Sequence, residues 1–198
     1  YSRAGVAAFT TSTGYGIAKY DNPEELSVSD RNNIGYQYTD CPLYWISVIY
    51  LNFAEAKAEM GSLTQDDLNN SINKLQARAG LPAMTTTPDA DPANNMGVSN
   101  LIWEIRRCRR CELIMDNWYR YWDLIRWHQL DKLDSTKYPN TMLGANVSNV
   151  PDCEEATKNG YIDASDAQIR TYEAKHYFYP IPTTQLTLNK NMKQNPGW

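Results

Sequence analysis

The sequence is organised around residues 101–133, which read LIWEIRRCRRCELIMDNWYRYWDLIRWHQLDKL. This segment contains most of the arginine and most of the tryptophan of the chain. Its apolar residues recur at helical spacing, so we expect a helix that buries one face. The register of this apolar stripe slips near residues 116–119, where we expect a break or kink. The stripe consists of Leu101, Ile105, Cys108, Met115, Trp122, Ile125 and Leu133.

Acidic residues of the same segment stand three or four positions from an arginine. Glu112 lies on the apolar stripe, and a buried carboxylate requires a cation, which Arg109 can supply from three residues earlier. The same spacing recurs one and two turns further along. We interpret these charges as a structural ion-pair network that pins the two halves of the helix together. Its members are Arg109, Glu112, Asp116, Arg120, Asp123 and Arg126.

The three acids of this network, Glu112, Asp116 and Asp123, are also the candidates for catalysis. Helical glycosidases use paired carboxylates to cleave a glycosidic bond. Each acid has an arginine at helical contact distance, however, and a neighbouring cation favours the ionised form, which cannot act as a general acid. The residues therefore favour a structural role, and we predict no catalytic residue in this chain.

Other common chemistries find little support in the sequence. The formal net charge is −4 and no basic patch stands apart from acids, which argues against a nucleic-acid partner. No apolar run reaches the roughly 18–20 residues that span a membrane. The cysteines and histidines show no metal-site spacing, so we predict no metal and no cofactor and interpret the cysteines as small apolar residues. These residues are Cys41, Cys108, Cys111, Cys153, His128 and His176.

A pair of helices is predicted before the central segment. Residues 43–60 carry apolar side chains on two helical faces, which indicates burial on more than one side. Gly61 ends this helix, and Thr64 begins the next one in a capping box with Asp67. The second helix closes at Gly80. The pair has about the length of a tetratricopeptide repeat and cannot bury both its faces alone.

The remaining segments are predicted to be mostly irregular. Residues 1–40 show no sustained helical period, and residues 134–164 form a long polar loop of a kind that often lies at a functional face. We expect a short helix near residues 164–174 and another over residues 185–188. The terminal Trp198 is expected to dock on the core.

Three blocks of the sequence resemble one protein family. RRCEL, the acid Asp116 and RYWDLIRW resemble the C-terminal signature of the SusD/RagB family of surface glycan-binding lipoproteins, roughly ERR-x-EL-x-x-EG-x-R-x-x-DL-x-RW. YLNFAEAKAEMG followed by INKLQARAGLP, and the ending YPIP…NPGW, agree in the same order. The sequence departs from the signature at Cys108, where the family has an acid, and at Asp116-Asn117, where it has Glu-Gly. Residues 117–119 also hold one residue more than the common spacing.

The resemblance implies a mainly α fold, a SusD-like α-helical superhelix with a tetratricopeptide-like helix pair and long irregular loops. It implies that the chain is the C-terminal part of a longer protein, with a secretion signal and a lipid-bearing cysteine upstream. We expect a single SusD-like C-terminal domain over residues 1–198. Its parts would be an irregular lead-in (1–40), the helix pair (43–82), the central signature helices (101–133), and loops with a C-terminal extended and turn segment (134–198).

The resemblance also implies a function and a place in the cell. A member of this family of Bacteroidetes would bind an oligosaccharide at the outer surface and deliver it to a SusC-like TonB-dependent outer-membrane transporter, without catalysis. It would be a surface-exposed outer-membrane lipoprotein, held to the membrane only by an N-terminal lipid anchor outside this chain. Two alternatives remain open: an all-α glycoside-active enzyme using Glu112, Asp116 or Asp123, and a helical-repeat scaffold that binds protein.

Sugar binding would use aromatic side chains, because the flat C–H face of a sugar ring stacks on tryptophan and tyrosine. Helical spacing already explains Trp103, Trp122 and Trp127 as core residues. Trp118 and Tyr119 instead fall at the register slip, so we name these two as candidate ligand-binding residues. The resemblance implies that most of the glycan site lies outside this chain.

Overall fold

The computed structural model describes residues 11–16, 19, 27, 29, 43–116, 119–150, 157–165 and 167–198. Two compact units are found in the chain. The helical unit comprises residues 19–120, and the sheet unit comprises residues 1–18 together with 121–198. The expectation of a single domain remains a prediction. Most of the predicted irregular lead-in lies outside the described residues.

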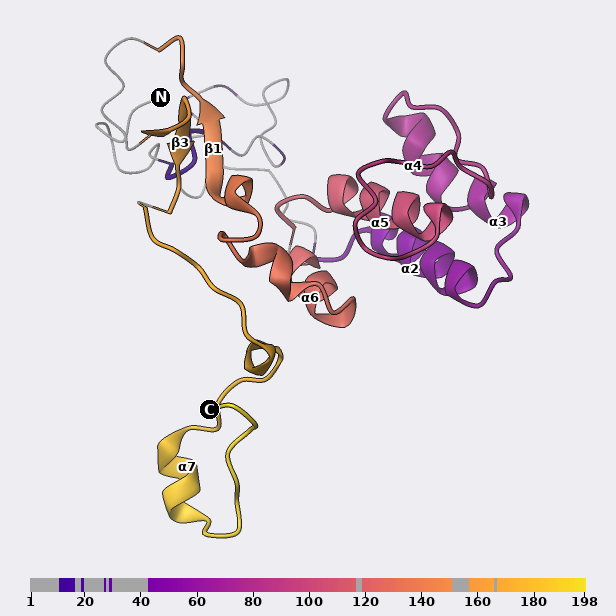
Figure 1. Ribbon diagram of the computed structural model, residues 1–198. Coiled ribbons are helices and arrows are strands. Elements are labelled where there is room, and N and C mark those ends of the chain that lie inside the picture. Colours follow the sequence, from indigo (N-terminus) through magenta and orange to yellow (C-terminus); the bar gives the residue numbers. More distant parts are fainter. Residues whose placement is uncertain are drawn as a thin grey trace. The chain divides into compact units, whose positions relative to one another are not determined.

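The helical unit contains the predicted helix pair and the first half of the central segment. Its helices are α2 (Ile46–Glu59), α3 (Gln65–Asn69), α4 (Ile72–Arg78) and α5 (Asn100–Glu112) (Figure 1). Helix α2 packs against both α4 and α5, and α3 packs against α4. The helical prediction is therefore confirmed, with the second helix divided into two. The core is formed by Val48, Leu51, Ala54, Leu68, Ile72, Leu75, Met84, Ile105 and Leu113.

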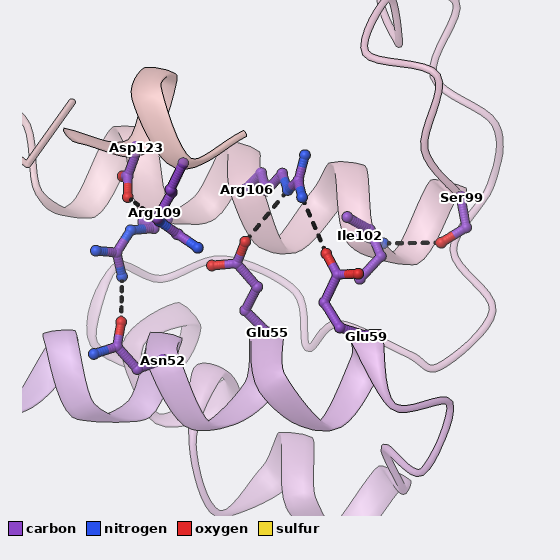
Figure 2. Close-up of polar contacts among 9 residues, drawn as sticks. Asn52, Glu55, Glu59, Ser99, Ile102, Arg106, Arg109 and Asp123 are labelled. Atoms are coloured by element: carbon purple, nitrogen blue, oxygen red, sulfur yellow. Dashed lines mark hydrogen bonds and ion pairs between the residues drawn. The ribbon is translucent and has the colours of Figure 1, made fainter. Parts of the chain in front are cut away.

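Local sequence signals set the ends of these helices. Asp67 N–H donates to Thr64 Oγ1 at 3.1 Å and Thr64 N–H donates to Asp67 Oδ2 at 2.9 Å, which is the predicted capping box. Gly61 follows α2 with a φ of 66°, a left-handed conformation that glycine adopts without steric cost. Ser99 accepts a hydrogen bond from Ile102 N–H at the start of α5 (Figure 2).

Within the helical unit, helix α2 buries one face. Leu51 and Ala54 are fully buried, whereas Tyr44, just before the helix, is 86% exposed and Ile49 is 59% exposed. The neighbours α4 and α5 cover the side that carries the core residues. The second apolar face is exposed among the described residues, and its burial stays a prediction.

The second segment of the sheet unit starts within α6 (Tyr119–Arg126), whose first two residues belong to the helical unit. Three strands, β1 (Leu143–Asn146), β2 (Thr157–Lys158) and β3 (Tyr161–Asp163), form an antiparallel sheet in the order β1-β3-β2. Figure 1 shows β1 beside β3. The other elements are the 3₁₀ helices η2 (Leu130–Leu133), η3 (Pro139–Met142) and η4 (Ala174–Tyr177), and the helix α7 (Thr183–Leu188).

The small sheet corrects the expectation of an irregular loop after residue 134. Its strands are too short to show a period-2 pattern, but the turn between β2 and β3 carries a recognisable signal, Asn159-Gly160. These two residues have φ values of 54° and 78°, as a two-residue hairpin turn requires. Ala145, Val147 and Ile162 form a small apolar cluster on the sheet.

The expected break in the central segment is confirmed. Helix α5 ends at Glu112, Met115 has a φ of 63°, and α6 begins at Tyr119. The predicted helix near residues 164–174 is wrong, because no helix begins in the described part of this range before η4. Helix α7 is present where a short final helix was predicted. Among the described residues, no helix combines the length and the apolar character needed to cross a bilayer.

Candidate functional site

A buried ion pair joins α5 to α2 in the helical unit. Arg106 Nε contacts Glu55 Oε1 at 3.3 Å, and Arg106 Nη2 contacts Glu59 Oε1 at 3.0 Å (Figure 2). The side chains of Arg106 and Glu55 are 10% and 6% exposed, so each charge is largely removed from water. The pair could not be predicted from the sequence, because Glu55 and Arg106 are 51 residues apart. Glu55 on an otherwise apolar helical face was the available signal.

The residues of the predicted network make the following contacts. Arg78 Nη2 donates to both carboxylate oxygens of Glu112, at 2.7 and 2.5 Å. Arg109 Nη1 donates to Asn52 Oδ1 at 2.8 Å (Figure 2). In α6, Arg126 Nε donates to Asp123 Oδ1 at 2.8 Å. The partner described for Glu112 therefore comes from α4, and the structural role of the network remains a prediction.

Lys19 closes the end of α5. Its ammonium donates to the carbonyl oxygens of Glu112 and Ile114, at 2.9 and 3.2 Å, and to Asp116 Oδ2 at 2.6 Å. Carbonyl groups at the end of a helix lack intrahelical partners and attract a cation. The Asp116 side chain is 1% exposed, so this lysine compensates a buried charge. Nothing in the local sequence indicates the contact, because the residues are more than 90 positions apart.

The two residues predicted to bind a ligand are only partly described. Trp118 lies outside the described residues. Tyr119 is half-buried, packs against the core of the helical unit, and lies 5.8 Å from the guanidinium of Arg109, measured to the ring centroid. Ligand binding by Trp118 and Tyr119 remains a prediction.

The tryptophans predicted to be core residues behave differently from one another. Trp127 is buried. Trp103 is half-buried and donates from Nε1 to Asp91 Oδ2 at 2.9 Å, a hydrogen bond that lowers the pKa of Asp91. Trp122 is 55% exposed, so its assignment to the core is wrong; the buried residues of α6 are Asp123 and Leu124.

The sheet unit contains a cavity of about 430 Å³ that we call the aromatic pocket. This volume is in the range of small-molecule sites. The pocket was not predicted from the sequence, because its lining residues come from separate segments of the chain. The aromatic run before YPIP and the terminal tryptophan were the available signals. The pocket is lined by Tyr121, Leu130, Leu133, Arg170, Thr171, Tyr172, His176, Phe178, Tyr179, Pro180 and Trp198.

One wall of the aromatic pocket is fixed by two residues that follow η2. Asp134 accepts hydrogen bonds from Thr136 Oγ1 at 2.5 Å and from Tyr172 N–H at 3.1 Å. These bonds, the one from the Thr136 hydroxyl foremost, lower the pKa of Asp134 to about 2. Ser135 N–H donates to the Arg170 carbonyl at 2.9 Å, and Arg170 N–H donates to Ser135 Oγ at 3.0 Å. Residues 170–172 are thereby held by their backbone.

Other lining residues, Tyr179, Pro180 and Trp198, belong to the block YPIP…NPGW. Gln194 accepts from Ile181 N–H at 2.8 Å and donates to the Ile181 carbonyl at 2.9 Å, and Asn195 Nδ2 donates to the Tyr179 carbonyl at 2.6 Å. Trp198 Nε1 donates to the carbonyls of Lys175 and Phe178, at 3.2 and 2.9 Å. The terminal indole is therefore fixed against η4 while it remains 46% exposed.

Three tyrosines, Tyr121, Tyr172 and Tyr179, line the aromatic pocket. Burial and a hydrogen bond with Tyr177 raise the pKa of Tyr172 to about 12. The hydroxyls of Tyr121 and Tyr179 are 3.3 Å apart, and this contact raises the pKa of Tyr121. Phenols with raised pKa values stay protonated at neutral pH, so they can both donate and accept hydrogen bonds.

Metal and thiol chemistry find no site in the described part of the chain. No group of three or more metal-ligating side chains is found there. Burial raises the pKa of Cys108 to about 11, which keeps it an unreactive thiol. Cys111 is an exposed free thiol. Cys41 and Cys153 lie outside the described residues.

A model of the SusD family matches residues 2–198. The chain belongs to the SusD family. The family resemblance of the three sequence blocks is therefore confirmed, and so is the mainly α fold expected of a SusD protein. A comparison with curated protein sequences gave no significant match.

Two solved structures are similar to this SusD-family chain. One is the crystal structure of a SusD-like protein (BF3747) from Bacteroides fragilis, with 25% sequence identity and a TM-score of 0.53 over 77% of this chain. The other, named BT4246, has 26% identity and a TM-score of 0.56 over 79% of this chain. The matched regions make up 25% and 23% of those two proteins, so this chain spans about a quarter of their length.

Proposed function

We propose that the protein is a surface nutrient-binding lipoprotein that captures an oligosaccharide and delivers it to a SusC-like TonB-dependent transporter. Membership of the SusD family over residues 2–198 is the observation that carries this proposal. The protein would lie on the outer membrane, held by an N-terminal lipid anchor outside this chain. Capture and release involve no covalent step, and no cofactor is required.

The contacts of the acidic residues support binding over hydrolysis. A glycosidase needs one carboxyl group to protonate the leaving oxygen and a second to act on the sugar. Both oxygens of Glu112 face Arg78, Asp116 is buried against Lys19, and Asp123 is paired with Arg126. Each carboxylate is thus occupied by a cation, which suits a structural role.

Calorimetric titration of the full-length protein with a panel of oligosaccharides tests the proposal. Saturable binding without release of new reducing ends is the expected result. Steady release of reducing ends would instead establish the all-α glycoside-active enzyme. Binding to the transporter with no affinity for any glycan would establish the protein–protein scaffold.

A further inference from the structure

We propose that the aromatic pocket of the sheet unit is itself a sugar subsite that binds one pyranose ring of an oligosaccharide. The inference rests on the proposed glycan-binding function and deepens it by naming a site and its residues. It differs from the Trp118 and Tyr119 hypothesis, because Tyr119 is not among the lining residues and Trp118 lies outside the described part of the chain.

The pocket combines exposed aromatic side chains with a backbone that hydrogen bonds hold in place. Phe178 is 55% exposed and Tyr179 is 69% exposed, although both line the cavity. The Phe178 carbonyl accepts from the Trp198 indole, and the Tyr179 carbonyl accepts from Asn195. A wall whose backbone is fixed before binding loses less conformational entropy when a ligand stacks on its side chains.

Polar groups stand around these rings. Arg170 is an exposed residue of the lining, and the hydrogen bonds that hold it in the wall are made by its backbone. Its guanidinium offers several N–H donors in one plane. Tyr121, Tyr172 and Tyr179 also line the pocket, and a tyrosine hydroxyl can donate or accept a hydrogen bond.

The combination of aromatic rings and polar side chains in the pocket favours a carbohydrate as ligand. A pyranose has a flat C–H face for the rings and a rim of hydroxyls for the guanidinium and the phenols. A purely apolar ligand would leave the polar rim without partners, which is unfavourable once water is excluded. The pocket volume of about 430 Å³ suits a short saccharide unit and not a long chain segment.

The test compares two pocket variants with a matched control in the full-length protein. Phe178→Ala removes the aromatic ring of a residue that is more than half exposed. Arg170→Gln removes the guanidinium but keeps the hydrogen bonds between the Arg170 backbone and Ser135. Phe53→Ala is the control, because Phe53 is a comparably exposed phenylalanine, 41% exposed, on α2 of the helical unit. The oligosaccharide that binds the wild type most tightly is titrated into each variant.

Each pocket variant should weaken binding about tenfold, while Phe53→Ala stays within about twofold of the wild type. If the wild type binds a saccharide and both pocket variants bind it with the same affinity, this inference is overturned and the proposed function stands. A lower melting temperature of Phe178→Ala with unchanged affinity would also overturn it, because it would show that a protein segment covers the rings. Absence of saccharide binding by the wild type would overturn the proposed function and this inference together.

Discussion

The cost of removing a charge depends on the exposure of its partner, as two glutamates of the helical unit illustrate. Glu55 is paired with Arg106, and both side chains are at most 10% exposed. Glu112 is paired with Arg78, whose side chain is 60% exposed. The sequence predicted that Glu112 is buried and paired with Arg109, so replacing Glu112 was expected to destabilise the fold strongly. Because the structure places the buried pair at Glu55 and Arg106, we expect the larger loss of stability on replacing Glu55.

Glu55→Gln should lower the free energy of unfolding by about 3–5 kcal/mol, because Arg106 keeps a buried charge with a weakened partner. Glu112→Gln should cost less than about 1 kcal/mol, because Arg78 can turn to water. Urea unfolding followed by circular dichroism measures both. Equal losses for the two variants would contradict the assignment of the buried pair to Arg106 and Glu55.

Asp134 should make the sheet unit sensitive to acid. Its pKa is about 2 in the folded protein against an ordinary value of 3.8, so the folded state binds this proton less readily than the unfolded state. The stabilisation is therefore complete above about pH 4 and is lost as the pH falls toward 2. Asp134→Asn should remove this part of the pH dependence in melting curves recorded between pH 2 and 5. An identical pH profile for the variant would rule out the contribution of Asp134.

At the scale of the elements, neighbouring residues determine the helix ends. The strands and the aromatic pocket depend on contacts between residues far apart in the sequence. The capping box at Thr64 and the break after Glu112 could be predicted from neighbouring residues. The strands could not, because β1 and β3 are short and their pairing partners are distant, although Asn159-Gly160 was a usable hairpin signal. The aromatic pocket escaped prediction for the same reason, since its walls are separated in the sequence.

Gly160→Ala should destabilise the sheet unit by about 1–2 kcal/mol. Gly160 has a φ of 78°, and an added Cβ would collide with the hydroxyl of Ser148. Gly16→Ala is the matched control, because an added Cβ there meets no atom within 4 Å. The melting temperatures of the two variants provide the comparison. A loss of stability for Gly16→Ala as large as for Gly160→Ala would contradict the hairpin geometry.

For the molecule as a whole, the family match and the residue contacts support the proposed function by separate routes. The SusD family supplies the expectation of surface nutrient binding. Among the described residues, the three candidate catalytic acids are each paired with a cation. The described part of the chain also forms an aromatic pocket that is lined by polar side chains as well. Fold and family could be predicted because the signature blocks are local in sequence. The identity of a ligand could not, because the shape of a binding site depends on residues far apart in the chain.

The most direct test of the central claim is calorimetric titration of the full-length protein with plant and host oligosaccharides, with each mixture analysed afterwards for cleavage products. Our account predicts saturable binding of at least one oligosaccharide, which is recovered intact. Cleavage of the bound oligosaccharide, or the absence of binding to every member of the panel, would contradict it.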